Sequence, residues 1–275
     1  MTTGTLRGKT VLVTGASRGI GRAIALRAAA DGANVVLAAK TAEPRPDLPG
    51  TIHSVAEEVR SAGGRALPCE LDVRSEEQIE RAVAAAVDAF GSLDALVNNA
   101  GAISLTGTLE TPMKRFDLMW AVNARATFAC SRACLPHLLR AANPHILNLA
   151  PPPRLEPRWF EAHAAYTLSK YGMSLCALGM AAEFADRGVA VNCLWPATII
   201  DTAALRILGA RVRPEQGRSP RIVADAAHAI LIRPSREVTG RFFLDEEALR
   251  EAGVVDFESY AVAPGVPLVK DLFVD

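Results

Sequence analysis

A tyrosine and a lysine stand four residues apart in a segment with helical periodicity. Tyr166 and Lys170 are therefore expected on one face of a helix. A free tyrosine, with a pKa of about 10, is a poor base at neutral pH. A neighbouring ammonium favours the phenolate and lowers that pKa, which makes tyrosine a usable general acid and base. The same spacing is common on any helix, so the chemistry depends on the surrounding motifs.

A glycine-rich loop, TGASRGIG, joins the first predicted strand to the first predicted helix. Gly15 allows a tight turn, Gly19 lets the backbone approach a pyrophosphate, and Gly21 permits close packing of the helix on the sheet. Free N–H groups at the helix start would then bind the phosphates. The predicted cofactor residues of this loop are Gly15, Ser17, Arg18, Gly19, Ile20 and Gly21. The alternative is a plain glycine-rich turn.

The end of the second predicted strand indicates which dinucleotide the loop binds. A carboxylate at that position would bond the ribose hydroxyls of NAD, but the strand ends on Lys40. Lys40 and Arg18 together offer two cations to a 2′-phosphate, and the sequence therefore favours NADP(H). The alternative is that Lys40 is an ordinary solvated lysine.

The elements that must position these residues alternate regularly along the chain. Strands are predicted at residues 10–14, 34–39, 65–71, 93–97, 145–149, 189–194 and 241–244. Helices are predicted at 19–31, 54–62, 75–90, 112–141, 163–187 and 198–210, with 112–141 forming either two helices or one bent helix. Ser75 and Gln78 indicate an N-cap with a capping box.

Continuous apolar strands separated by helices are typical of a parallel sheet covered on both faces. We therefore expect the α/β class: a doubly wound parallel sheet of the Rossmann type, in a single domain over residues 1–275. Ligands of such sheets bind beyond the carboxyl ends of the strands. An extension from about residue 245 carries mixed apolar residues and is expected to pack on its own or a neighbouring subunit.

The order of three motifs resembles the short-chain dehydrogenase/reductase family. They are the TGASRGIG loop, the NNAG segment at 98–101, and Tyr166 with Lys170. A finer resemblance, to the hydroxysteroid-dehydrogenase-like protein 2 group, is carried by the stretches AISLTGTLETPMKRFDLM, PHILNLAPP and YTLSKYGMS. The family resemblance covers roughly residues 7–245.

The resemblance implies further roles in the site. Asp72 corresponds to the acid that bonds the adenine amino group, with a helix N-cap as its alternative role. Asn99 belongs to the segment that steadies the central sheet and the cofactor ribose, and Lys170 also bonds the nicotinamide ribose. Asn123 corresponds to an asparagine that supports a water in the proton relay; the alternative is a structural bond inside the helix.

Two other positions after strands bear on the same chemistry. Ile199 would bond the nicotinamide carboxamide, and Thr202 would reach the pyrophosphate, by the same resemblance. The family usually has a serine for the substrate oxygen where this chain has Pro151. Losing one such donor costs roughly 10²–10³ in rate elsewhere. Ser104 and Thr106 are the nearest substitutes that we propose from sequence.

The composition excludes several classes of protein. Lys plus Arg and Asp plus Glu both count 30, so the chain is no strongly basic nucleic-acid binder. Five cysteines without a CxxC pair argue against a disulfide scaffold or a zinc cluster and favour a reducing compartment. No apolar run approaches the roughly 20 residues that span a membrane, and no metal site is expected. A cytoplasmic location follows as the expectation.

Two hypotheses remain for the function. The first is an NADP(H)-dependent oxidoreductase that interconverts a carbonyl and a secondary alcohol on an apolar, steroid- or fatty-acyl-like small molecule. The apolar face of 198–210 supports it, although core packing explains that face equally well. The second, favoured by the missing serine, is an NADPH-binding sensor or scaffold with little turnover. A homodimer or homotetramer through helices 75–90, 112–141 and 163–187 is implied by the resemblance.

Overall fold

The computed structural model describes residues 4–46, 48–205 and 212–275. Within them, parallel strands form one seven-stranded sheet in the order β3-β2-β1-β4-β5-β6-β7. The strands are β1 (Thr10–Thr14), β2 (Asn34–Ala39), β3 (Arg65–Glu70), β4 (Ala95–Asn98), β5 (His145–Asn148), β6 (Ala190–Trp195) and β7 (Phe242–Leu244). The predicted fold class, a single α/β domain with a doubly wound parallel sheet, is confirmed.

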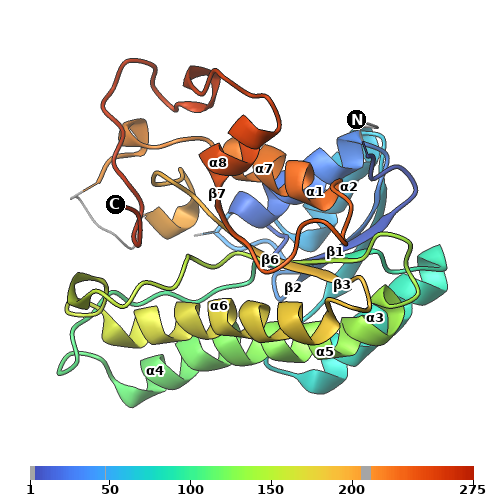
Figure 1. Cartoon of the computed structure of the whole chain (residues 1–275), viewed down its shortest axis with the longest axis horizontal. Helices are drawn as coiled ribbons and strands as arrows, with labels where there is room; N and C mark the ends of the chain where they lie inside the picture. The colour runs from blue at the N-terminus through green and yellow to red at the C-terminus, as the bar shows by residue number, and fades with distance from the viewer. Residues whose placement is uncertain (1–3, 47, 206–211) are drawn as a thin grey trace.

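Helices cover both faces of the sheet (Figure 1). They are α1 (Gly19–Ala30), α2 (Ile52–Ser61), α3 (Glu76–Phe90), α4 (Met113–Trp120), α5 (Ala126–Leu138), α6 (Ala164–Phe184), α7 (Arg221–Leu231) and α8 (Asp245–Glu251). Helices α1, α2, α7 and α8 share one hydrophobic core, and α3, α5 and α6 share the other. Successive residues of β1 alternate between the two cores: Val11 and Val13 belong to the first, and Leu12 to the second. This is why the strands are apolar without interruption.

The capping box predicted at Ser75 is wrong, whereas the prediction for 112–141 is met by two joined helices. Ser75 is the N-cap of α3 and accepts from the Gln78 N–H over 3.3 Å, but the Gln78 side chain accepts from the Asp72 N–H over 2.8 Å instead of closing a capping box. The stretch 112–141 contains α4 and α5, joined without a break by a π-helical turn at Ala121–Arg125.

The predicted helix at 198–210 is wrong where the structure describes it. Thr198 forms a β-bridge with Lys270, and Ile200 forms one with Arg218, so residues 198–200 are extended. The pairing partner is a segment far along the chain, which local periodicity does not indicate. Residues 203–205 form a short 3-10 turn and not part of an α-helix. Residues 206–211, with Ile207 and Leu208, lie outside the described ranges.

The strand order places a crevice where the site is expected. From β1 the chain moves one way to β2 and β3, then returns to β4 on the other side of β1. The loops after β1 and β4 therefore diverge, and such a switch point is where doubly wound sheets bind ligands. None of the helices in the described ranges has the length and apolar content needed to cross a membrane.

Candidate active site

A cleft of about 490 Å³ opens at the carboxyl ends of the first four strands. Most of the predicted site residues line it: Gly15, Ser17, Arg18, Gly19, Ile20, Lys40, Asp72, Asn99, Tyr166 and Lys170. A smaller cavity of about 170 Å³ shares Tyr166 and Lys170 and adds Ile199. The topology thus gathers residues from distant parts of the sequence at one edge of the sheet.

The glycine loop is shaped by close contacts with the loop after β4. Gly15 has a φ of +66°, a backbone conformation that favours glycine. A Cβ on Gly21 would lie 2.4 Å from Asn99 Nδ2 and 2.5 Å from the Gly15 carbonyl oxygen. No side chain in the described ranges caps the start of α1 at Arg18. The first N–H groups of the helix are therefore available for an anion.

Asn98, the last residue of β4, and Asn99, which follows it, make structural hydrogen bonds. Asn99 Nδ2 donates to the carbonyl oxygens of Thr14, at 2.8 Å, and Gly15, at 3.2 Å. Its backbone N–H donates to the Thr14 hydroxyl at 3.0 Å. Asn98 Nδ2 donates to Asn148 Oδ1 at 2.9 Å across the sheet. These bonds fix the glycine loop and support the scaffold role that the resemblance implied.

The cationic side of the cleft is formed by Lys40 and Arg18. The Lys40 ammonium lies 4.0 Å from the Asp72 carboxylate and its side chain is 65% exposed. The Arg18 guanidinium donates to the Pro49 and Gly50 carbonyl oxygens, at 3.3 and 3.2 Å. Asp72 does not cap a helix; the Arg74 guanidinium holds its carboxylate, chiefly by hydrogen bonds, and lowers its pKa.

Helix α6 places Tyr166 and Lys170 on the same cavity, as their spacing predicts. Both side chains are buried. Lys170 Nζ donates to the Leu149 carbonyl oxygen at 2.6 Å and lies 5.1 Å from the centre of the Trp195 ring. Because Leu149 directly follows β5, this bond fixes the ammonium at the end of the sheet.

The predicted effect of Lys170 on Tyr166 is not seen in this arrangement. Burial, with a smaller contribution from the charge of Asp271, raises the pKa of Tyr166 above its ordinary value. Burial also lowers the pKa of Lys170 to about 8. The expected lowering of the tyrosine pKa is wrong here because other side chains enclose the phenol and disfavour its charged form.

Asn123 lies in the π-helical turn and is fully buried. Its side chain accepts from the Ala102 N–H at 2.8 Å and donates to the Ala102 carbonyl oxygen and Ser169 Oγ, both at 2.9 Å. The side chain therefore ties the loop after β4 to α6, which is a structural bond between elements, not within one helix. π-turns of this kind occur often at functional sites.

The hydroxyl missing at Pro151 is not replaced by the residues suggested from sequence. Pro151 is buried, and its carbonyl oxygen accepts from Ser174 Oγ at 2.6 Å. The Thr106 hydroxyl is bonded to that of Thr111 at 2.7 Å. Among the described residues that line the two cavities at Tyr166, neither Ser104 nor Thr106 occurs.

Both backbone groups of Ile199 are paired inside the chain. Its N–H donates to the Val269 carbonyl oxygen at 3.0 Å, and its carbonyl oxygen accepts from the Arg218 N–H at 2.9 Å. Thr202 lines both cavities. A carboxamide could use the Ile199 N–H only after Val269 moves.

The extension packs on its own subunit, which was one of the two expectations. It also reaches the site, and the sequence did not indicate this. Phe273 is fully buried and stacks on Tyr166, with ring centroids 6.3 Å apart and planes at 27°. Trp159 and Phe160 belong to the same cluster. Neither is among the described residues that line the two cavities at Tyr166.

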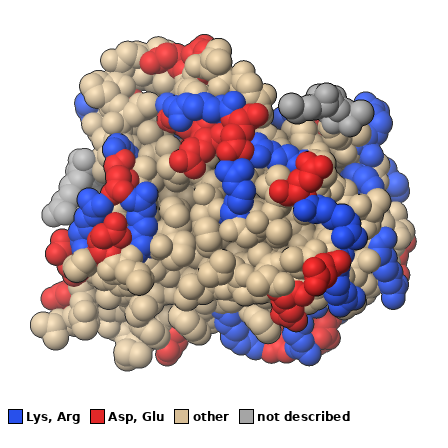
Figure 2. All heavy atoms as spheres, viewed as in Figure 1, with Lys and Arg blue, Asp and Glu red and all other residues tan. Residues whose placement is uncertain are grey.

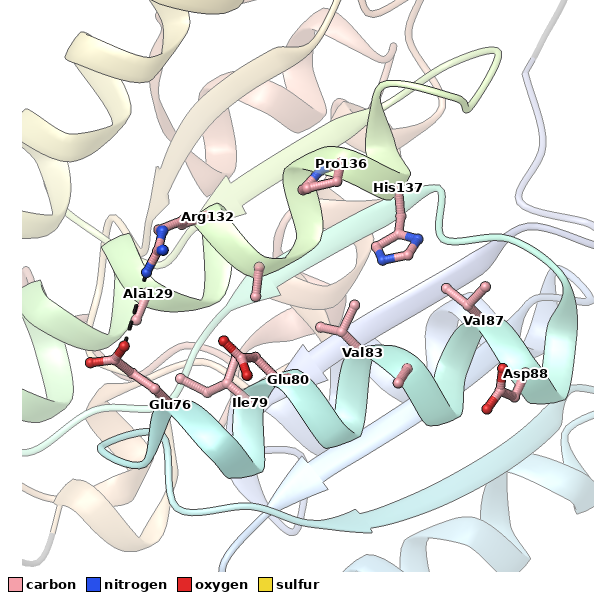
Figure 3. Close-up of a pocket in the computed structure, with 12 residues that line it drawn as sticks. Glu76, Ile79, Glu80, Val83, Val87, Asp88, Ala129, Arg132, Pro136 and His137 are labelled. Carbon is pink, nitrogen blue, oxygen red and sulfur yellow. Dashed lines mark ion pairs between the residues drawn. The ribbon is translucent and has the colours of Figure 1, made fainter.

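A further groove, of about 570 Å³, lies elsewhere. Figure 3 shows it between α3 and α5, with Glu76 and Arg132 forming an ion pair at one end. Its walls combine apolar side chains such as Val83 with charged ones such as Asp88. It contains none of the predicted site residues.

The fold and the site define a class of protein. Residues 9–211 match the family model of the short chain dehydrogenases, and the chain belongs to that family. It is 58% identical over 274 residues to hydroxysteroid dehydrogenase-like protein 2 of Danio rerio, an alignment that spans 99% of this chain and 65% of that protein. The chain thus spans slightly less than two thirds of the length of this curated relative.

Solved structures show the same fold. A Xanthomonas campestris protein described as a dehydrogenase is 59% identical, with a TM-score of 0.97, covering 98% of this chain and 99% of that one. Carveol dehydrogenase from Mycobacterium avium, solved in complex with NAD, has a TM-score of 0.75 at 21% identity, covering 88% of this chain and 97% of that one. At that identity the second likeness concerns the fold alone.

Proposed function

We propose that this protein is an NADP(H)-dependent oxidoreductase that interconverts a carbonyl and a secondary alcohol on an apolar small molecule. The observation that carries the proposal is that Tyr166 and Lys170 line the same cleft as the glycine loop. A dinucleotide bound along this cleft would lie with its reactive end near the two side chains. When bound, the nicotinamide supplies or accepts the hydride.

The cleft fits a dinucleotide on three grounds. The start of α1 offers N–H groups to a pyrophosphate, the Gly21 position leaves no room for a Cβ, and Asn99 holds the loop in place. Arg18 and Lys40 stand together on the adenosine side, and no acid ends β2. This arrangement supports NADP(H) over NAD(H), since a 2′-phosphate requires cations. Asp72 is proposed to contact the adenine.

The chain's own residues would transfer the proton to and from the substrate oxygen. In the reductive direction the Tyr166 hydroxyl donates its proton to the carbonyl oxygen, which becomes the alcohol. Lys170, held by Leu149, would stabilise the phenolate that results once Phe273 no longer covers the ring. Asn123 keeps the loop after β4 against α6 and so maintains the position of both groups.

The walls of the small cavity support an apolar substrate. Ile103, Trp195, Ile200 and Leu205 line it alongside Tyr166. An apolar group that leaves water for such walls gains roughly 25 cal/mol per Å² of buried surface. A steroid- or fatty-acyl-like carbonyl compound matches these surroundings.

A second candidate function is a sensor or scaffold that binds NADPH with little turnover. Pro151 offers no hydroxyl to the substrate oxygen, and Tyr166 is enclosed. Both observations favour this reading, whereas the placement of Tyr166 and Lys170 on one cavity favours the enzyme.

We also propose association through the outer helices. Trp120, Phe128, Leu168, Leu175 and Leu178 are each 45% or more exposed on α4, α5 and α6. Figure 2 shows a broad stretch without charged side chains in the region of α6. A second copy covering this face would give a homodimer, or a homotetramer with a further contact.

The described free cysteines favour a reducing compartment such as the cytoplasm.

The test is a fluorescence titration with NADPH and NADH, followed by the loss of NADPH absorbance with a panel of apolar aldehydes and ketones. Tighter binding of NADPH with turnover is the expected result. Binding without turnover on any compound favours the sensor reading. Equal or tighter binding of NADH contradicts the role proposed for Lys40 and Arg18.

A further inference from the structure

Five rings enclose the side chain of Phe273 directly at the proposed catalytic tyrosine. The centroid distances from Phe273 run from 5.3 Å to 6.3 Å, and the rings belong to Trp159, His163, Tyr166, Tyr171 and Trp195. We call these five residues the ring cage. Phe273 fills it completely, with no exposed surface.

The backbone of Phe273 is strained. Its φ is +69°, and among the described residues it alone has a positive φ without being glycine. Bulky residues adopt this conformation rarely, because it costs free energy. Burial of the ring offsets that cost, so the cage is one of the contacts that hold the segment in place.

The segment around Phe273 is attached by a few bonds. Val269 accepts from the Ile199 N–H, and the Leu272 carbonyl oxygen accepts from Trp195 Nε1 at 2.7 Å. These contacts lie on groups that face the proposed site, since Ile199 and Trp195 both line the small cavity. A ligand that enters the cavity competes with them.

Two arginines bind Asp275, the next acidic residue after Phe273 in the segment. The carboxylate of Asp275 is ion-paired with Arg154 and Arg158, which lie in the loop between β5 and α6. A guanidinium fork binds a carboxylate or a phosphate equally well.

We propose that residues 269–275 occupy the substrate site of the free protein, and that the substrate carries the same two features. It would place an apolar, ring-sized group in the ring cage against Tyr166 and an anionic group on Arg154 and Arg158. This inference rests on the proposed function and names the substrate class more closely. The segment covers Tyr166 but presents no reducible ketone to it. It therefore fills the substrate site without reacting.

The test measures binding in the absence of NADPH, using a redox-inert pair of probes: 4-phenylbutanoate and its neutral isostere 4-phenylbutanamide. A Trp120→Phe background restricts the fluorescence to Trp159 and Trp195, since the chain has three tryptophans. Phe273→Ala should tighten binding of both probes at least ten-fold, because the cage is emptied. Val255→Ala, at a 91% exposed position, is the matched control and should change neither.

A second set of variants tests whether the substrate's anionic group binds Arg154 and Arg158. On the Phe273→Ala background, Arg154→Ala with Arg158→Ala should weaken the carboxylate about 3- to 10-fold and leave the amide unchanged; the pairs are half-exposed, which keeps the effect modest. Equal effects on both probes overturn the anion assignment. Unchanged binding in Phe273→Ala overturns the proposal that the segment occupies the site. If Phe273→Ala does not fold, unchanged binding in the milder Asp275→Asn overturns it. Failure of the proposed function would instead appear as absent NADPH binding or turnover independent of Tyr166.

Discussion

The backbone N–H of Ile199 donates a hydrogen bond to the Val269 carbonyl oxygen over 3.0 Å. The family resemblance assigns that same N–H to the cofactor carboxamide. If the carboxamide takes this N–H as proposed, Val269 must give it up, and binding of the nicotinamide then displaces the segment at this point.

We therefore expect NADPH to release residues 269–275. Amide hydrogen exchange of this segment should rise at least ten-fold at saturating NADPH, because its bonds to the 197–199 stretch are lost. The turn at Glu258–Tyr260 is the internal control and should keep its exchange rate. Unchanged exchange in the segment, with NADPH bound, would mean that the carboxamide is held elsewhere.

Substitution of Gly21 separates close packing from helix propensity. Gly21→Ala should destabilise the fold by about 1–3 kcal/mol and weaken NADPH at least ten-fold, because its Cβ would clash with Asn99 Nδ2 at 2.4 Å. Gly179→Ala, in α6 with nothing within 4 Å of the added Cβ, should stabilise by about 0.5–1 kcal/mol. Denaturant unfolding checks both. Similar results for the two variants would rule out the packing role of Gly21.

Lys40 should discriminate between the two dinucleotides. Lys40→Ala is expected to weaken NADPH about 3- to 5-fold, a modest effect because the side chain is 65% exposed, and to leave NADH unchanged. Lys114→Ala, at an exposed position on α4, is the control. Parallel losses for NADPH and NADH in a pair of titrations would refute a 2′-phosphate contact.

The charge state of Asp271 should affect stability between about pH 4 and pH 7. Desolvation, with Asp245 nearby, raises the pKa of Asp271 to about 7, whereas the unfolded chain releases this proton at about pH 4. In that window the folded state binds more protons, so stability falls as pH rises. Asp271→Asn removes this dependence and should gain roughly 1–3 kcal/mol on wild type from pH 4 to pH 7.

Thermal and denaturant unfolding of both proteins at pH 4, 5.5 and 7 provides the measurement. Asp88→Asn, at an exposed position on α3, is the matched control. A difference between Asp271→Asn and wild type that stays constant over the three pH values would contradict the assignment.

The sequence predicts the sheet and most of the cleft because both depend on local patterns. Continuous apolar strands, the glycine loop and the four-residue spacing of Tyr166 and Lys170 suffice to place these groups together. The role of Ser75 as an N-cap also follows from neighbouring residues. The partner of the Gln78 side chain does not follow from them. This side chain accepts from the Asp72 N–H, because the chain before the helix turns back over it.

Contacts between distant segments explain the remaining errors. Local periodicity at 198–210 indicates a helix, but Thr198 pairs with Lys270 in an extended conformation. Burial and the charge of Asp271 raise the pKa of Tyr166, and Phe273, more than a hundred residues away, stacks on its ring. Neither effect has a signal in the local sequence. The one available hint was the mixed apolar composition of the extension, which indicated packing but not where.

Single-turnover hydride transfer from NADPH in Tyr166→Phe tests the central claim most directly. With a ketone that wild type reduces, the variant should be slower by 10²–10⁴-fold, while its NADPH dissociation constant stays within about two-fold of wild type. That result would identify the Tyr166 hydroxyl as the proton donor. A Tyr166→Phe variant that reduces the ketone at the wild-type rate, with NADPH bound equally well, would contradict the account.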